Sequence, residues 1–342
     1  MSFKRLDQED IVISADSITA PAWSNNSTTL SEFFTDSGQI SRTSGDYYYN
    51  VYQTGSGLST AAIQFSIAYG HLHGSGSIPF NPGVDEYAPS QVVYKQFRNL
   101  VNGTEETNLN FAGTTVKSVY ALSIERARFK EKLLPGSLTL ELKGSGSQYI
   151  KLTDDSNYVS TVTYGDSGRE FEIISGAAGT RFTGTGTDGV YGYSSTSGSY
   201  GKFLPDIGVI LLNGDALDNA KSNGGILLGT ATSTGSNSAN LDTMFESIKS
   251  GSNFVLRSEE TVSSNYIFVR ARNSEFNYST NPSNITGSGE LRHDVMIDSP
   301  QAYITSVGLY NDNNDLLGIA KLSRPLLKDF TKESLIRVKL DY

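Results

Sequence analysis

The carboxyl-terminal stretch Leu335-Ile336-Arg337-Val338-Lys339-Leu340-Asp341-Tyr342 alternates polar and apolar residues. After Leu335, polar side chains occupy the odd positions and apolar side chains the even ones. This two-residue period is typical of a strand with one buried face. The stretch therefore predicts a strand that closes a β-sheet and turns its apolar side chains into the core.

The preceding residues predict a hairpin that leads into this strand. Tyr303–Tyr310 has the composition of a strand, and Leu316–Leu322 has that of a returning strand. The segment 311–315 between them contains only Asn and Asp, which tolerate turn conformations. A chain end that supplies a strand to a sheet is held in place. We therefore expect earlier segments of the chain to complete this sheet.

The composition predicts a mainly-β fold. The chain has 342 residues, which by length corresponds to about two domains or to one long β-rich body with an insertion. Hydrophobic residues make up 37%, charged residues only 18%, and there are 34 Gly and 19 Tyr. This mixture favours strands and turns over helices. We expect a β-sandwich-like body with an inserted β region and two short helices.

The expected domain boundaries follow changes in composition. Residues 1–143 are predicted to form an arm and the first part of the β body. Residues 144–235 are rich in Gly, Ser and Thr, and short β-like pieces there alternate with turn residues. They are predicted to form the inserted region. Residues 236–342 are predicted to form the second part of the body, with the closing strands.

Two segments have the features of short helices. After Ser90, apolar residues recur at helical spacing until Asn102-Gly103, which is typical of a helix end: Val93, Phe97, Leu100 and Val101. The second segment is 240–248, in which Asn240 is expected to cap the amino end.

Charge and cysteine content limit the function classes. The net charge of −9 disfavours binding to nucleic acid phosphates. The absence of cysteine excludes disulfides and thiolate metal sites. We see neither a signal peptide nor a run of about 20 apolar residues, so we expect folding in a cytoplasm and no membrane partner.

Three histidines were considered as metal ligands. His71 and His73 would lie on one face of a strand, and His293 is a conceivable third ligand. The glycine-rich sequence after His73 favours an exposed loop instead. We therefore predict no metal and no other cofactor, with His71 and His73 as weak candidates.

One tetrapeptide has the composition of a protease nucleophile. Gly165-Asp166-Ser167-Gly168 matches the nucleophile motif of chymotrypsin-like proteases, but Arg169 stands where a glycine follows in that family. Asp-Ser-Gly is also typical of a polar turn. The turn interpretation is favoured, and no catalytic residue is predicted.

Tyrosines in the Gly/Ser-rich region suggest an alternative function. Tyr191 and Tyr193 lie beside Gly and Ser, and a tyrosine ring can stack on a sugar. A glycan-binding receptor module is therefore kept as an alternative. Packing at a protein interface is the favoured role for these tyrosines.

The closing segment resembles the end of structural proteins from T4-like contractile-tailed phages of cyanobacteria, and similar endings occur in phage tail and baseplate proteins. The resemblance covers most of the chain and is weakest in the Gly/Ser-rich middle. It rests on the hairpin, on Phe330-Thr331-Lys332-Glu333, and on three further stretches: 47–53, 126–137 and 273–279.

The resemblance implies a virion structural protein of the tail, in the baseplate or where fibres attach, with no catalytic residues. Its partners would be other tail proteins, in multiple copies. A neck, collar or capsid-surface position remains an alternative. The arm around the only tryptophan and the closing strands are predicted to make the contacts, with these interface residues: Trp23, Tyr303, Leu309, Tyr310, Ile336, Val338 and Leu340.

Overall fold

The structure is a computed structural model that describes residues 4–40, 47–74, 90–182, 197–230 and 237–341. The chain divides into two compact units. Unit 1 comprises Met1–Ser17 and Thr261–Tyr342, and unit 2 comprises Ile18–Glu260. The chain therefore crosses between the units twice.

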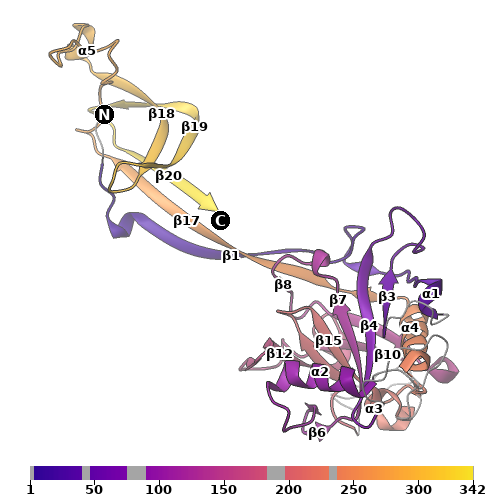
Figure 1. Ribbon diagram of the computed structural model, residues 1–342. Coiled ribbons are helices and arrows are strands. Elements are labelled where there is room, and N and C mark those ends of the chain that lie inside the picture. Colours follow the sequence, from indigo (N-terminus) through magenta and orange to yellow (C-terminus); the bar gives the residue numbers. More distant parts are fainter. Residues whose placement is uncertain (1–3, 41–46, 75–89, 183–196, 231–236, 342) are drawn as a thin grey trace. The chain divides into compact units, whose positions relative to one another are not determined.

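Unit 2 is built on a 12-stranded sheet whose assigned pairs are antiparallel, which confirms the predicted mainly-β fold (Figure 1). In order of pairing, the strands are β2 (Thr29–Leu30), β16 (Phe254–Val255), β9 (Thr139–Lys143), β10 (Tyr149–Asp154), β12 (Gly168–Ala177), β14 (Gly201–Leu204), β15 (Val209–Asn213), β7 (Ser118–Ile124), β4 (Ile63–His71) and β3 (Tyr48–Tyr52). Two short strands, β11 (Thr163–Gly165) and β13 (Thr180–Arg181), pair with β12.

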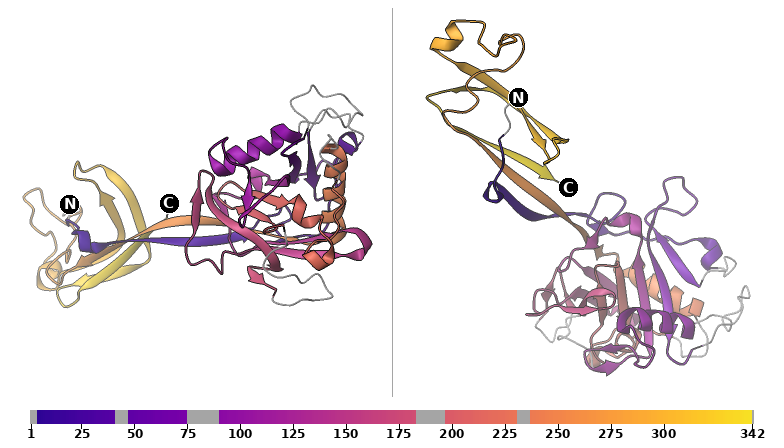
Figure 2. Two further views of the ribbon diagram at one scale, coloured as in Figure 1. Left: turned by 90° about the horizontal axis from the view of Figure 1, so that it is seen from below. Right: turned by 60° about the vertical axis from the view of Figure 1, so that its left-hand side comes forward.

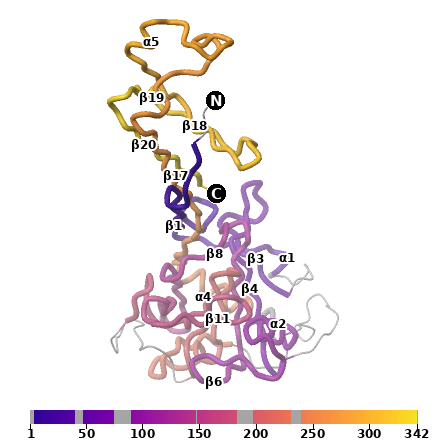
Figure 3. The backbone as a smooth tube through the Cα atoms, turned by 90° about the vertical axis from the view of Figure 1, so that its left-hand side faces the viewer, coloured from indigo at the N-terminus to yellow at the C-terminus, as the bar shows by residue number. Residues whose placement is uncertain are grey.

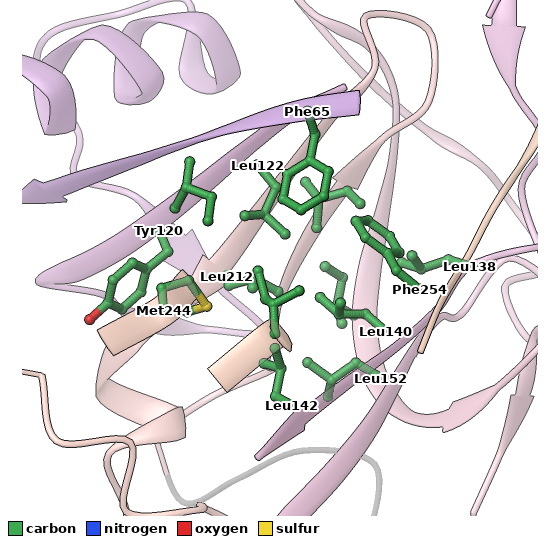
Figure 4. Close-up of a cluster of buried hydrophobic side chains, with 14 of the residues drawn as sticks. Phe65, Tyr120, Leu122, Leu138, Leu140, Leu142, Leu152, Leu212, Met244 and Phe254 are labelled. Atoms are coloured by element: carbon green, nitrogen blue, oxygen red, sulfur yellow. The ribbon is translucent and has the colours of Figure 1, made fainter. Parts of the chain in front are cut away.

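This sheet is curled, because residues near its opposite ends touch. Phe65 of β4 and Phe254 of β16 meet edge to face, with ring centroids 5.3 Å apart (Figure 4). Trp23 packs on Phe254 at 4.9 Å, and its indole N–H donates to the Phe254 carbonyl at 2.9 Å. Aromatic pairs of this geometry contribute beyond the area that they bury. The seam between the ends of the sheet is therefore apolar and tightly packed.

The predicted sandwich with an inserted region differs from this arrangement. Among the described residues, the body of unit 2 is one continuous sheet, and residues 144–235 supply its central strands β10, β12, β14 and β15. Ile173 and Leu211 from that region are fully buried. The Gly/Ser/Thr-rich composition reflects the turns between these strands. The short β-like pieces expected there are strands, but they belong to the main sheet and its core.

Helix α2 (Ser90–Asn102) has the predicted bounds and covers one face of the sheet. Val119 and Ala121 of β7 pack in the cluster that includes α2, whereas Tyr120 and Leu122 belong to the larger core on the other face. Alternate residues of β7 are thus buried on both sides, which explains its nearly continuous apolar sequence. A side chain at Gly70 of β4 would lie 2.6 Å from the backbone nitrogen of Tyr94 in α2, so the close approach of helix and strand requires glycine.

Helix α4 (Asn237–Gly251) confirms the second predicted helix and begins before the expected cap. It is the long orange helix in Figure 2. Its apolar residues join the larger core: Leu241, Met244, Phe245 and Ile248. The remaining short elements of unit 2 are α1 (Ser37–Ile40), α3 (Gly214–Leu217), β5 (Asn110–Phe111), β6 (Thr114–Thr115) and β8 (Lys132–Leu133). With both sheet faces covered, unit 2 has an extensive core.

In its described residues, unit 1 contains strand segments from two sheets, the 3₁₀ helix η1 (Gln8–Asp10) and one short α-helix. In one sheet, β17 (Arg257–Ala271) lies between β1 (Ile11–Pro21) and β20 (Ser334–Asp341). Strands β1 and β17 continue past the boundary into unit 2, where β17 also pairs with β8. The second sheet is the hairpin of β18 (Gln301–Tyr310) and β19 (Leu316–Asp329).

The hairpin confirms the predicted strand, turn and returning strand. At its turn, the Asn311 side-chain oxygen accepts hydrogen bonds from the backbone N–H groups of Asn313 and Asp315. This is the capping role for which Asn is favoured in turns. Between β17 and β18 the chain makes a long excursion, residues 272–300, which contains α5 (Val295–Asp298) (Figure 3).

Candidate interaction surface

Unit 1 buries very few apolar side chains. Among its described residues, the buried hydrophobic side chains are Ile267, Ala271 and Val338. Its other buried residues are polar: Ser264, Asn277, Lys328 and Ser334. Burial of apolar area is the main favourable contribution to folding, and it must offset the entropy cost of ordering each residue. Unit 1 therefore has little internal stabilisation for its size.

The hairpin exposes large apolar side chains on its strands. Tyr303 of β18 is 65% exposed, and Leu317 and Ile319 of β19 are 70% and 61% exposed. Val307 and Leu309 of β18 are only partly buried. Leu317 and Ile319 lie close together near the turn of the hairpin, and exposed apolar residues that lie together mark interaction sites more often than isolated ones do. The hairpin is therefore the strongest candidate for a contact surface.

The strand pair β17–β20 also leaves apolar side chains exposed. Ile267 lies opposite Val338, and Val269 lies opposite Ile336, so these residues share one face of the sheet. On the other face, Leu335 lies opposite Arg270 and is 63% exposed. The expectation that the last strand turns its apolar side into a core therefore holds fully for Val338 alone. Ile336 is partly buried and Leu340 is exposed.

Charged groups on this sheet are paired at the surface. Arg270 forms a two-point ion pair with Glu333, and its hydrogen bonds lower the pKa of the Glu333 carboxyl. Hydrogen bonds from Ser264 and then Lys339 lower the pKa of Asp341, which lies 3.0 Å from the Lys339 ammonium group. Exposed ion pairs contribute little to stability. The stability of unit 1 therefore depends on the pairing of its strands and on the covering of its exposed apolar side chains.

A buried lysine anchors the excursion between β17 and β18. The Lys328 side chain is fully buried, and its ammonium group donates to the Asn277 side-chain oxygen at 2.6 Å and to the carbonyls of Asn273 and Asp329 at 3.2 and 2.9 Å. The Asn277 amide in turn donates to the Asn273 carbonyl at 2.7 Å. A buried cation is tolerated only when it is hydrogen-bonded in this way. Among the few buried side chains of unit 1, this polar cluster takes the place of the apolar packing that most domains have.

Six of the seven predicted interface residues lie in the strands of unit 1: Tyr303, Leu309, Tyr310, Ile336, Val338 and Leu340. Trp23 does not, because it belongs to unit 2 and is 2% exposed in the core. Its assignment to a contact arm is therefore corrected: the indole is buried against Phe65 and Phe254 of the same chain. Sequence reasoning also missed Leu317, Ile319 and Leu335. The sequence contained a sign of them: adjacent residues of these strands are both apolar, as in Leu316-Leu317 and Leu335-Ile336, so one of each pair must face away from a one-sided core.

The weak metal candidates do not form a described cluster. His71 and His73 have ring centroids 6.1 Å apart, and the His73 backbone N–H donates to the His71 ring nitrogen Nδ1. Burial lowers the pKa of His71. His293 belongs to unit 1, whereas the other two belong to unit 2. In the parts of the chain that the structure describes, no group of three or more metal-binding side chains gathers.

Ser167 occupies a hairpin turn, as the turn interpretation predicted. Gly165 pairs with Gly168 across the end of β11 and β12, so Asp166 and Ser167 form the two-residue loop. Gly168 has φ +97°, which glycine adopts easily. The Ser167 hydroxyl is buried and makes no hydrogen bond, so no base activates it in this geometry.

The neighbouring Arg169 fixes this turn to the sheet. Its backbone N–H and guanidinium group donate to the Asp206 carboxylate, at 2.8 Å and 2.6 Å. These hydrogen bonds and the Arg169 charge hold the pKa of Asp206 below its usual value, although partial burial acts in the opposite direction. The residue that departs from the protease motif therefore has a structural role. Tyr191 and Tyr193 lie outside the described residues.

Comparisons of the chain with protein-family models, with curated proteins and with solved structures found no match. None of the helices in the described ranges combines the length and the hydropathy needed to cross a membrane.

Proposed function

We propose that this chain is a structural protein of a contractile phage tail, placed in the baseplate or where fibres attach, and that it acts by docking with other tail proteins. In this proposal, unit 2 is the stable body. Unit 1 is the docking module. The resemblance of the closing segment to phage tail proteins supports the proposal, together with the division of the chain into a well-packed and a poorly packed unit.

The observation that carries the proposal is the exposed apolar surface of the β18–β19 hairpin. Tyr303, Leu317 and Ile319 are each more than half exposed, although the two strands that carry them pair with each other along most of the hairpin. Covering a large apolar side chain contributes about 1.5–3 kcal/mol. A protein that acts alone in solution gains nothing from such a surface. In a component of a large assembly, covering these side chains with a partner protein contributes binding free energy that holds the component in place.

Immunogold labelling of purified tailed particles tests the location. We would raise an antibody against residues 157–164, an exposed segment of unit 2 that docking through unit 1 leaves free. Label at the tail tip is the expected result, and antibody preabsorbed with the peptide is the control. Label confined to the neck or head would contradict the baseplate placement. Particles without label would contradict the virion function.

A further inference from the structure

Segment 312–324 of the β18–β19 hairpin has opposite charges at its two ends. Its middle, residues 316–320, contains only apolar residues and glycine. Two carboxylates precede this apolar run and two cations follow it: Asp312, Asp315, Lys321 and Arg324. All four charged side chains are exposed. The segment therefore has an acidic end at the turn, an apolar middle and a basic end.

These charges are not neutralised within the described part of the chain. The Asp315 carboxylate accepts a hydrogen bond from the neutral side-chain amide of Asn311 at 3.0 Å. Neither end of the segment forms an ion pair with another described residue. On β20, by contrast, Lys339 lies 3.0 Å from Asp341 of the same strand. Both ends of segment 312–324 thus keep their charge available to a partner.

The apolar middle of the segment is also open to a partner. Leu317 and Ile319 are 70% and 61% exposed, whereas the alternate residues Gly318 and Ala320 are partly buried. Across the hairpin, Ile319 lies opposite Gly308, which has no side chain to cover it. The exposed apolar side chains therefore lie between the acidic end and the basic end.

We infer that segment 312–324 of one copy of this chain lies antiparallel against the same segment of a second copy, in a two-fold symmetric dimer. This inference rests on the proposed function, because it names one docking partner of the hairpin. The antiparallel arrangement places the acidic end of each segment beside the basic end of the other, with the two apolar runs in contact. One surface patch then meets its own copy, as in other two-fold interfaces. A parallel arrangement would oppose like charges, which is destabilising.

The two charged ends decide between possible occupants. A polyanion, such as nucleic acid or an anionic membrane, would be repelled by Asp312 and Asp315. A uniformly basic protein surface would be repelled by Lys321 and Arg324. A partner that fits must present an acidic and a basic end in the reverse direction, with apolar side chains between them. The antiparallel second copy supplies this match with the same residues.

The contact is small, so the dimer is expected to be weak. A segment of this length buries less surface than the about 1,200 Å² of a standard stable interface. We expect half of the chains to be dimeric at about 10–100 μM, while a dilute chain is monomeric and keeps Leu317 and Ile319 exposed. In an assembly, neighbouring copies are held at high effective concentration, which favours the contact. The exposed Tyr303 lies outside the segment and stays available to other tail proteins.

Charge variants of the full chain test the contact by sedimentation velocity between about 1 and 300 μM. D312K/D315K makes both ends of the segment basic, and K321D/R324D makes both ends acidic. Each double variant alone is expected to associate about tenfold more weakly than the wild type or worse, because like charges then meet at both ends. An equimolar mixture is expected to recover wild-type association, which also shows that both variants fold.

A quadruple variant tests the antiparallel direction. D312K/D315K/K321D/R324D exchanges the acidic and the basic end, so it is expected to associate with itself about as the wild type does. Mixed with the wild type, it is expected to form no mixed dimers, because antiparallel contact would then oppose like charges. Mixed dimers would overturn the antiparallel arrangement.

An apolar variant tests the middle of the segment. L317T/I319T is expected to weaken association by about tenfold or more, because it removes the exposed apolar area that the contact covers. Y164T is the matched control, since Tyr164 is 73% exposed in unit 2, and it is expected to associate as the wild type does. Circular dichroism checks that both variants keep their strands. Wild-type association of L317T/I319T would overturn the proposed contact.

The two proposals fail differently. A wild-type chain that stays monomeric up to the highest concentration, or a mixture of the charge variants that does not associate, overturns the dimer, and the immunogold experiment still decides the virion function. A chain that dimerises as described but is missing from tailed particles has the opposite meaning: the dimer stands and the virion function is overturned.

Discussion

Replacing Lys328 with methionine is expected to release residues 272–300 from unit 1 while unit 2 stays folded. Methionine fills a similar volume but cannot donate the three hydrogen bonds that reach Asn277, Asn273 and Asp329. Leaving buried acceptors without their donor costs about 1–3 kcal/mol for each group that water cannot reach. We expect a loss of about 3 kcal/mol in the stability of this segment.

Hydrogen–deuterium exchange measures this loss segment by segment. A loss of about 3 kcal/mol raises exchange in peptides from 272–300 by about a hundredfold. K332M is the matched control, since Lys332 is exposed and nearby, and its exchange is expected to match that of the wild type. Unchanged protection in K328M would show that the buried lysine does not hold the excursion.

Replacing Trp23 with alanine is expected to destabilise unit 2 by about 3–5 kcal/mol. The indole is 2% exposed, packs against Phe254 and Phe65, and donates to the carbonyls of Phe254 and Thr28. Alanine would remove the packing and both hydrogen bonds at the seam where the sheet closes. Phenylalanine keeps most of the ring and is expected to cost less than alanine.

Urea unfolding followed by far-ultraviolet circular dichroism gives the two values. Y164A is the control, because Tyr164 is 73% exposed, and surface substitutions change stability by about 0.5 kcal/mol or less. If W23A were as stable as Y164A, the indole would not be a core residue. The contact-arm role that the sequence predicted for Trp23 would then stand.

The local structure could be read from the sequence where the pattern was periodic. The α2 bounds and the β18–β19 hairpin were predicted closely, because spacing and turn residues act over a few positions. The burial of Trp23 could not be read in this way. The residues that follow it are Ser and Asn, no apolar period surrounds it, and its packing partner Phe254 lies far away in the chain.

The division into units also escaped the sequence. Residues 1–17 join unit 1 because they pair with a strand more than 200 residues away, and no local pattern encodes such a pairing. Residues 144–235 looked separate because turns dominate their composition, although their short apolar runs form the middle of the sheet. Six of the seven residues predicted to make contacts lie in strands of unit 1, but the sequence did not show that the rest of unit 1 leaves large apolar side chains of these strands exposed.

The most direct test of the account is covalent surface labelling of the β18–β19 hairpin in the isolated chain and in purified tailed particles. In the isolated chain, Tyr303 should label about as strongly as the exposed Tyr164 of unit 2, and Leu317 and Ile319 should label as exposed aliphatic side chains do. In particles, the account predicts that the hairpin residues lose most of their labelling while Tyr164 keeps its own. Equal labelling of the hairpin in both samples would contradict the claim that unit 1 is a docking module.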